Sequence, residues 1–128
     1  MMSLVWLIDD DAPTNLLNKI LLKESGFAKE VQDFIYAEEA LNELASEDTE
    51  FPDLILLDIN MPRMNGWEFL QYLKALNRMV TPPTILMLST SLNPVDRQRA
   101  EENKIVSGFI KKPLTTDQLL DLLERYQD

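Results

Sequence analysis

Residues 52–70 read PDLILLDINMPRMNGWEFL, and this stretch decides the fold. It contains a short apolar run at residues 54–57, which is typical of a strand buried on both faces, and Asp58 follows that run directly. A loop with Pro62 and Gly66 comes next, and residues 67–76 then carry apolar side chains at helical spacing. The stretch therefore predicts a buried strand, a loop and a helix, with a carboxylate at the end of the strand.

The same alternation extends along the whole chain. Four more short apolar runs, at residues 4–8, 31–35, 85–88 and 108–110, are each followed by an amphipathic segment. The runs at 4–8, 54–57 and 85–88 are nearly all apolar, which favours buried parallel strands. Five strands alternating with five helices predict an α/β fold with a doubly wound parallel sheet.

Helical spacing of apolar residues marks four of the helices clearly. The expected inner faces consist of Leu17, Ile20 and Leu21 in the segment 14–25; Ala37, Ala40, Leu41, Leu44 and Ala45; Phe69, Leu70 and Leu73; and Leu119, Leu122, Leu123 and Tyr126. The segment 94–102 has Pro94 in a suitable first-turn position but offers only Val95 and Ala100 for apolar contact. We expect this fourth helix to be the loosest element.

Composition excludes several classes of function. The 128 residues fit one domain, and a net charge of −10 repels nucleic acids and anionic membranes. The absence of histidine and cysteine excludes zinc clusters, thiolate sites and catalysis by a histidine of this chain. No stretch approaches the roughly 20 apolar residues of a membrane span, so a cytoplasmic location is the default expectation.

Polar residues follow the predicted strands at their carboxyl ends, where ligands bind in such sheets. They are Asp9, Asp10 and Asp11 after the first strand, Asp58 after the third, Ser89 and Thr90 after the fourth, and Lys112 after the fifth. Crowded carboxylates oppose joint ionisation unless a cation compensates them, and oxygen ligands alone select a hard cation such as Mg²⁺ or Mn²⁺. A carboxylate also serves as a nucleophile toward a phosphoryl group, and Lys112 and Ser89 are placed to neutralise its oxygens.

Four stretches together resemble the marker segments of the response-regulator receiver domains. They are VWLIDDDAP at 5–13, the stretch at 52–70, ILMLSTS at 85–91 and GFIKKPLT at 108–115. The resemblance covers nearly all of residues 1–128 and is closest to the single-domain type, of which the chemotaxis response regulator is the best-known member. It implies a flavodoxin-like (βα)5 fold with strand order 2-1-3-4-5.

The resemblance also implies a role for each site residue. Asp58 is the phosphoacceptor, Asp9 and Asp10 hold the metal together with Asp58 and the backbone carbonyl of Asn60, and Lys112 pairs with a phosphoryl oxygen. Ser89 and Phe109 match the hydroxyl and the aromatic residue that move on activation, and the Lys112-Pro113 peptide is usually cis in this family. Thr90 departs from the family pattern, since a smaller residue usually stands there.

Partners are implied as well. A histidine kinase or a histidine phosphotransfer protein donates the phosphoryl group, and a protein target is contacted through the fourth helix, fifth strand and fifth helix, with Leu120 as a candidate anchor. Since the sequence ends one helix after Lys112-Pro113, no output domain is expected. The chain is thus expected to act as a switch that catalyses only its own phosphorylation and dephosphorylation.

Simpler readings remain beside this one. Asp11, before Ala12 and Pro13, is equally well explained as a helix cap. A metal-dependent phosphohydrolase also uses an aspartyl nucleophile, but the second acid it needs is replaced here by Asn60. A receiver that has lost its chemistry and only binds proteins is the third reading, which intact Asp58 and Lys112 oppose.

Overall fold

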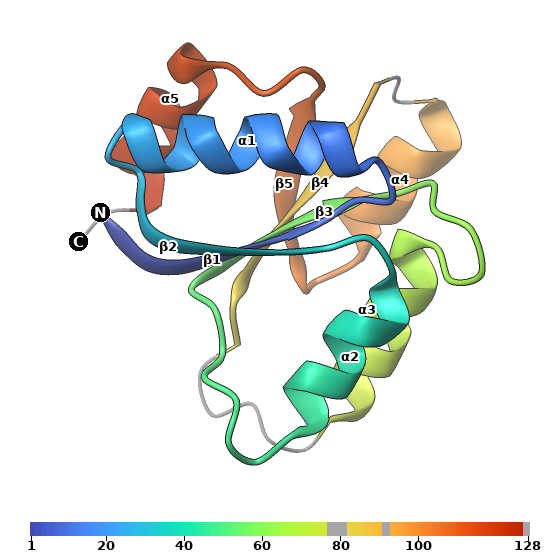
Figure 1. Ribbon diagram of the computed structural model, residues 1–128. Coiled ribbons are helices and arrows are strands. Elements are labelled where there is room, and N and C mark those ends of the chain that lie inside the picture. The colour runs from blue at the N-terminus through green and yellow to red at the C-terminus, as the bar shows by residue number, and fades with distance from the viewer. Residues whose placement is uncertain (77–81, 91–92, 127–128) are drawn as a thin grey trace.

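The computed structural model describes residues 1–76, 82–90 and 93–126 and shows a three-layer α/β fold (Figure 1). The five strands are β1 (Met2–Ile8), β2 (Ala28–Phe34), β3 (Leu54–Asp58), β4 (Thr84–Ser89) and β5 (Val106–Lys111). The five helices are α1 (Ala12–Glu24), α2 (Ala37–Ala45), α3 (Gly66–Ala75), α4 (Pro94–Glu102) and α5 (Thr116–Tyr126). Strands and helices alternate without exception along the described chain, as predicted.

The sheet is parallel with the order β2-β1-β3-β4-β5, which confirms the expected strand order. The strand register places Ile8 of β1 beside Leu57 of β3, and Asp58 beside Leu88 of β4. The chain order reverses direction across the sheet between β1 and β3, which is the topological switch point of this fold. The carboxyl ends of β1, β3 and β4 therefore meet at one place.

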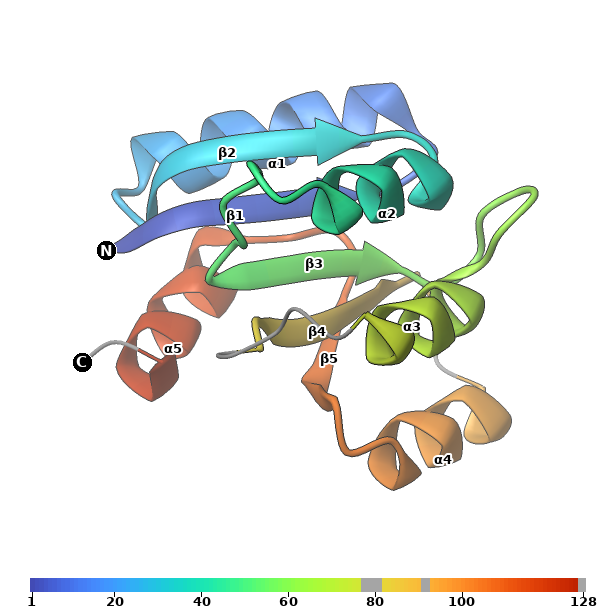
Figure 2. The same cartoon turned by 90° about the horizontal axis from the view of Figure 1, so that it is seen from below.

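Helices cover both faces of the sheet, and the strand residues alternate between them (Figures 1 and 2). Val5, Leu7, Leu54 and Leu56 face the layer of α1 and α5, whereas the residues between them face the layer of α2, α3 and α4. Since both faces are covered, the central strands need apolar side chains at every position. This explains why they appear in the sequence as unbroken apolar runs.

Helix α1 differs from the prediction in which face it buries. Its buried residues are Asn15, Asn18 and Leu22, whereas Leu17 and Ile20 are 67% and 44% exposed, and Leu21 is only half-buried. The predicted inner face was therefore wrong. The reason lies in the end of the sheet beneath α1, because the Asn15 amide donates to the carbonyls of Asp9 (2.8 Å) and Phe34 (3.3 Å). Backbone acceptors there require a polar helix face.

The other helices follow their predicted faces more closely. In α3, Phe69, Leu70 and Leu73 are fully buried, and in α5 Leu119 and Leu122 are buried while the side chain of Tyr126 lies outside the described part. In α2, Ala45 is exposed although the pattern placed it inside. In α4, Ala100 is buried but Val95 is 65% exposed, so α4 makes even less apolar contact than expected.

Strand β2 begins three residues before its predicted start, at Ala28 instead of Val31. The prediction relied on apolar runs, and it missed this part of the strand because Lys29 and Glu30 are polar. They are tolerated because β2 lies at the edge of the sheet and pairs only with β1. None of the described helices is long and apolar enough to span a membrane.

Candidate functional site

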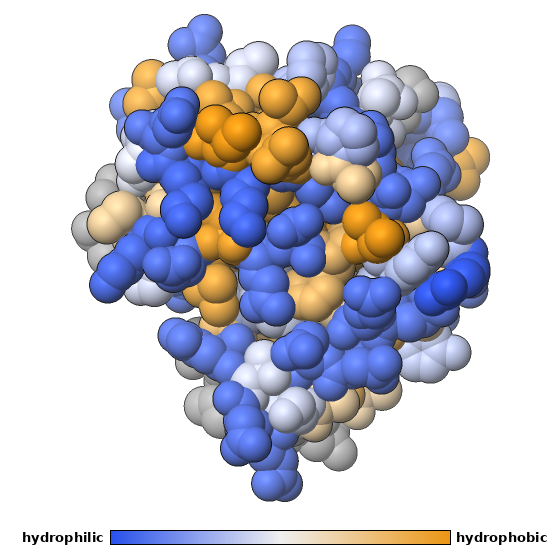
Figure 3. Space-filling model, in the orientation of Figure 1, coloured by the Kyte–Doolittle hydropathy of each residue, from blue (hydrophilic) through white to orange (hydrophobic). Residues whose placement is uncertain are grey.

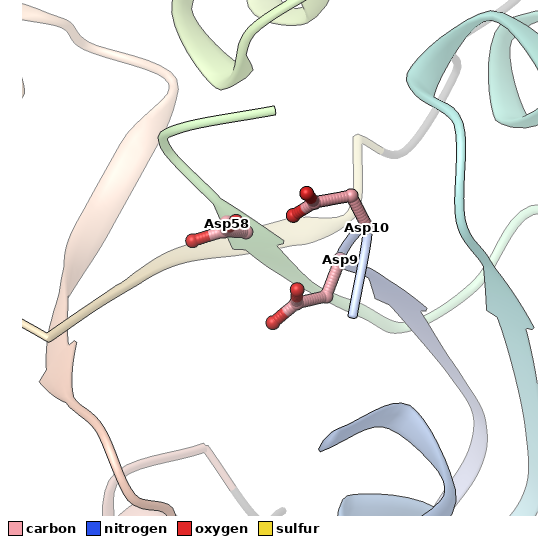
Figure 4. Close-up of side chains that lie close together, drawn as sticks. All are labelled: Asp9, Asp10 and Asp58. Atoms are coloured by element: carbon pink, nitrogen blue, oxygen red, sulfur yellow. The ribbon is translucent and has the colours of Figure 1, made fainter. Parts of the chain in front are cut away.

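Three carboxylates meet at the carboxyl ends of β1 and β3 (Figure 4). Asp9 and Asp10 follow β1, Asp58 ends β3, and each of the three offers an oxygen within 4.8 Å of the others. Asp9 and Asp58 are buried, whereas Asp10 is exposed. The structure therefore brings the predicted acidic residues together in one half-open cluster.

Lys112 lies against this cluster. Its Nζ is 2.6 Å from Asp9 Oδ2 and 3.2 Å from Asp58 Oδ1. Its side chain is 16% exposed, so both ion pairs are largely shielded from water. The lysine follows β5 and reaches across to β1 and β3, with its backbone N–H donating to the Ser89 carbonyl at 2.8 Å. Thus four strands contribute to one polar site.

The environment of Asp58 raises its pKa to about 6. Burial contributes most, the negative charge of Asp9 adds to it, and the ammonium of Lys112 partly offsets both. The pKa of Lys112 is raised as well, since its contacts with Asp9 and Asp58 outweigh the burial that opposes its charge. At neutral pH Asp58 is therefore mostly ionised but more basic, and hence more nucleophilic, than an exposed aspartate.

Asn15 and Asp11 support Asp9 from the start of α1. The Asn15 amide holds the Asp9 carbonyl, as described above, and the Asp11 N–H donates to Asp9 Oδ1 at 3.0 Å. Asp11 occupies the N-cap position, but its side chain accepts from the Thr14 hydroxyl and caps no backbone N–H. The contribution of Asn15 was missed in the sequence, because a single asparagine inside a helix gives no signal of its contacts.

The remaining predicted residues lie around the cluster. Ser89 is buried at the end of β4, one residue beyond the partner of Asp58 in the sheet. Phe109 is half-buried on β5 beside Met87, and Asn60 is exposed two residues after Asp58. The Lys112-Pro113 peptide is cis, as the family resemblance implied.

Gly66 fixes the distance between β3 and α3. A Cβ atom at this position would lie 2.6 Å from the carbonyl oxygen of Asp58 and 3.2 Å from Cα of Ile59. The Gly66 N–H donates to the Ile59 carbonyl at 2.9 Å. Glycine is needed at this position because the start of α3 lies in direct contact with the backbone of Asp58. A positive φ angle is not the reason.

A groove of about 450 Å³ opens beside the cluster, between α1 and the loop after β5. Leu17, Leu21, Pro113 and Leu114 form its apolar walls, and the polar lining comes from Thr14, Asn18, Thr90 and Lys112. Leu16, Leu17 and Ile20 continue this apolar surface outward along α1, where Figure 3 shows a hydrophobic patch. Since Lys112 belongs to both, the groove and the carboxylate cluster are neighbours.

Comparison with known proteins agrees with this geometry. The sequence profile of the response regulator receiver domain matches residues 5–124. The crystal structure of a two-component response regulator from Cytophaga hutchinsonii is similar, with 33% identity and a TM-score of 0.85 over 97% of this chain and 96% of that one. The chemotaxis protein CheY4 of Vibrio cholerae is also similar, with 28% identity and a TM-score of 0.79 over 98% of each chain.

Among curated sequences, the DNA-binding transcriptional regulator NtrC of Proteus hauseri is 30% identical over 122 residues. The match includes 94% of this chain but only 24% of NtrC, so the chain spans about a quarter of that relative's length. What the relatives share with the chain is thus the receiver domain and its fold. The chain belongs to the response regulator receiver domain family of two-component systems.

Proposed function

We propose that Asp58 is the phosphoacceptor of this receiver domain and takes its phosphoryl group from the phosphohistidine of a histidine kinase or a histidine phosphotransfer protein. The observation that carries the proposal is the position of the Asp58 carboxylate, 3.2 Å from Lys112 Nζ and within 4.8 Å of oxygens of Asp9 and Asp10. The nucleophilic carboxylate of Asp58, the ammonium group of Lys112 and a set of oxygen ligands for a hard metal ion thus lie together.

The proposed reaction is a transfer between two groups. An oxygen of Asp58 attacks the phosphorus, the new O–P bond forms, and the P–N bond to the donor imidazole breaks. The donor histidine leaves with the electron pair of that bond and takes up a proton. Because the pKa of Asp58 is about 6, its carboxylate is ionised at neutral pH and is ready to attack without a separate base.

The donor set suits Mg²⁺, with Mn²⁺ as a substitute, since the described cluster offers only oxygen ligands. Asp9, Asp10, Asp58 and the carbonyl of Asn60 would hold the ion. Its role would be to neutralise the charge of the carboxylates and of the phosphoryl oxygens. Lys112 adds a second positive charge beside Asp58, and its ion pair with Asp9 keeps that ammonium in place.

Two further residues complete the proposed switch. The hydroxyl of Ser89, at the end of β4, donates to the transferred group, and Phe109 changes its side-chain position with that movement. Phe109 is half-buried and packs against the core on the side of α4, so a change in its position would be felt on that face. The signal then reaches a protein target on the face of α4, β5 and α5, where Leu120 is 54% exposed.

The donor protein is proposed to bind the apolar groove between α1 and the loop after β5. This groove borders Lys112 and therefore the acceptor. The buried Asn18 side chain lines it and makes no hydrogen bond within the described residues, so it is available to a partner. The outward leucines of α1, which no other described element covers, then become the contact surface for the donor.

Intact mass after incubation with acetyl phosphate and Mg²⁺ tests the central proposal. The wild type should gain the mass of one phosphoryl group, whereas Asp58→Ala should gain none. Asp48→Ala, which removes an exposed carboxylate outside the cluster, is the control. Phosphate uptake by Asp58→Ala at the wild-type rate would falsify the assignment of the acceptor.

A further inference from the structure

Helix α4 has almost no apolar attachment to the rest of the molecule. Within α4 only Ala100 is buried, and Val95 is 65% exposed. A helix of nine residues is not stable in isolation, and helices in proteins normally obtain their stability by packing an apolar face. Some other contact must therefore hold α4 beside the sheet.

One side chain of α3 supplies that contact. The indole Nε1 of Trp67 donates to Asp96 Oδ1 at 3.1 Å, and the guanidinium carbon of Arg99 lies 5.4 Å from the centre of the Trp67 ring. Asp96 and Arg99 are three residues apart and so lie on the same side of α4. Trp67 is buried, which strengthens both the hydrogen bond and the cation–π contact.

Both helix starts are capped so that these partners are fixed in place. Asp96 donates its N–H to the Asn93 side chain at 2.8 Å in the first turn of α4. Trp67 lies in the first turn of α3, where Asn65 and Glu68 form a reciprocal capping box. The hydrogen bond from Trp67 to Asp96 therefore joins two rigid helix starts rather than two mobile surface groups.

Trp67 is also next to the backbone of the acceptor. Its neighbour Gly66 packs so closely on the carbonyl of Asp58 that no side chain fits between them. A shift of the Asp58 backbone must move the start of α3, and with it the indole. The path from Asp58 through Gly66 and Trp67 to α4 does not pass through Ser89 or Phe109.

We propose that Trp67, Asp96 and Arg99 form a clasp that positions α4 and that reports loading of Asp58 to this helix. The positioning part stands on the resting structure alone. The reporting part rests on the proposed function, because it requires Asp58 to receive a phosphoryl group. The clasp is thus a second route from the acceptor to the face proposed for the target.

Amide hydrogen exchange tests the positioning part. Trp67→Phe keeps an aromatic ring but removes the indole donor, and it leaves the sequence of α4 unchanged. The α4 amides should exchange roughly five- to tenfold faster in this variant, the effect of losing one shielded hydrogen bond. Tyr72→Phe removes a polar group from an exposed residue of α3, the helix that carries Trp67. It should leave the exchange rates of the α4 amides unchanged. Wild-type exchange rates in Trp67→Phe overturn the clasp.

A second pair of variants keeps this test valid if Trp67→Phe does not fold. Asp96→Ala removes the acceptor, whereas Glu101→Ala removes an exposed carboxylate from the same helix. The indole N–H signal of Trp67 should shift upfield and exchange faster with water only in Asp96→Ala. If the signal is equally insensitive to both changes, the hydrogen bond does not hold α4.

Beryllofluoride with Mg²⁺, a mimic of the phosphoryl group, tests the reporting part. Fluorine NMR measures loading of Asp58, and the Trp67 indole signal measures the response of the clasp. In the wild type both should saturate at the same concentration, and in Trp67→Phe the shifts of the α4 amides should be roughly twofold smaller at equal loading. Failure of the wild type to load would contradict the proposed function. Full loading with an unmoved indole signal would overturn the reporting role alone.

Discussion

Lys112 lies closer to Asp9 than to Asp58, at 2.6 Å against 3.2 Å, although Asp58 is the proposed acceptor. The resting lysine is therefore anchored mainly by a carboxylate that keeps its charge when Asp58 is phosphorylated. This arrangement leaves the ammonium in position to contact the new phosphoryl oxygens. It also makes Lys112 a structural partner of the buried Asp9, which gives the first prediction.

Lys112→Ala should destabilise the protein by about 2–4 kcal/mol in EDTA, because it leaves buried Asp9 and Asp58 without their compensating charge. It should also raise the pKa of Asp58 further, since the lysine lowers it in the wild type. Chemical denaturation measures the first effect. Lys111→Ala, which removes an exposed neighbouring charge, should change stability by less than about 0.5 kcal/mol. Equal effects of the two substitutions would show that Lys112 has no special electrostatic role.

Asp58→Asn should melt higher than the wild type in EDTA at neutral pH. The folded-state pKa of Asp58 is about 6, above the value of 3.8 for the free side chain, so folding favours the protonated form. An acid whose pKa is raised by folding does not lower the free energy of unfolding at a pH below its unfolded-state pKa. As the pH rises above that value the acid destabilises the fold increasingly, and the effect is complete once the pH exceeds the folded-state pKa. The difference between variant and wild type should therefore be small near pH 4 and full above pH 6.

The size of that difference is on the order of 1–2 kcal/mol once solvent screening of the half-open cluster is included, or a few degrees in Tm. Differential scanning calorimetry from pH 4 to 8 measures it, with Asp48→Asn as a control outside the cluster. A difference that stays constant over this range would mean that Asp58 does not titrate near pH 6.

Magnesium should stabilise the wild type by mass action. The expected gain is about 2.7 kcal/mol when free Mg²⁺ reaches a hundred times its dissociation constant. Asp58→Asn should gain less, because one of the three clustered carboxylates has lost its charge. Melting at matched ionic strength, with Na⁺ replacing Mg²⁺, separates binding from screening. An equal gain from the two salts would argue against a specific site.

Gly66→Ala should be destabilising by about 1–3 kcal/mol, since its methyl group would overlap the Asp58 carbonyl. Phosphorylation by acetyl phosphate should also slow, because the backbone of the acceptor must shift. Gly108→Ala is the matched control, as its Cβ would meet only the Leu86 side chain at 3.4 Å. Denaturation midpoints of the two variants test this. A tolerated Gly66→Ala would mean that α3 is free to move away from β3.

Leu17→Asp should impair phosphotransfer from a donor protein at least roughly tenfold while leaving acetyl phosphate uptake unchanged. The side chain is exposed in the resting protein, so the substitution should cost little stability. Leu120→Asp, on the face proposed for the target, should leave both reactions unchanged. Parallel phosphotransfer assays decide this, and slower uptake of acetyl phosphate by Leu17→Asp would indicate damage to the site itself.

The sequence predicted the sheet well because buried parallel strands require unbroken apolar runs, as β3 and β4 show. The carboxylate cluster was predictable for the same reason, since the residues after the strands must meet at one edge of the sheet. Helical periodicity, however, identified an apolar face of α1 that the fold does not bury. Periodicity marks an apolar stripe along a helix, and it does not show whether the sheet of the same chain covers that stripe.

Other features left no pattern to find. The ion pair of Lys112 with Asp9 joins residues 103 positions apart, and the hydrogen bond from Trp67 to Asp96 joins residues 29 positions apart, in two helices separated by β4. Repulsion among the carboxylates was expected to raise a pKa in the cluster, but burial raises that of Asp58 more than Asp9 does. Burial of a single side chain depends on the whole packed structure.

The edge strand β2 also affects how the protein behaves at high concentration. An edge strand exposes unpaired backbone groups, which act as a template for strand addition by another molecule and so for aggregation. Lys29, Glu30 and Asp33 place exposed charges along this edge. A second β2 strand approaching it would have to strip these charges of water, which costs free energy. The polar residues that obscured the start of β2 in the sequence thus protect the protein from assembling into larger sheets.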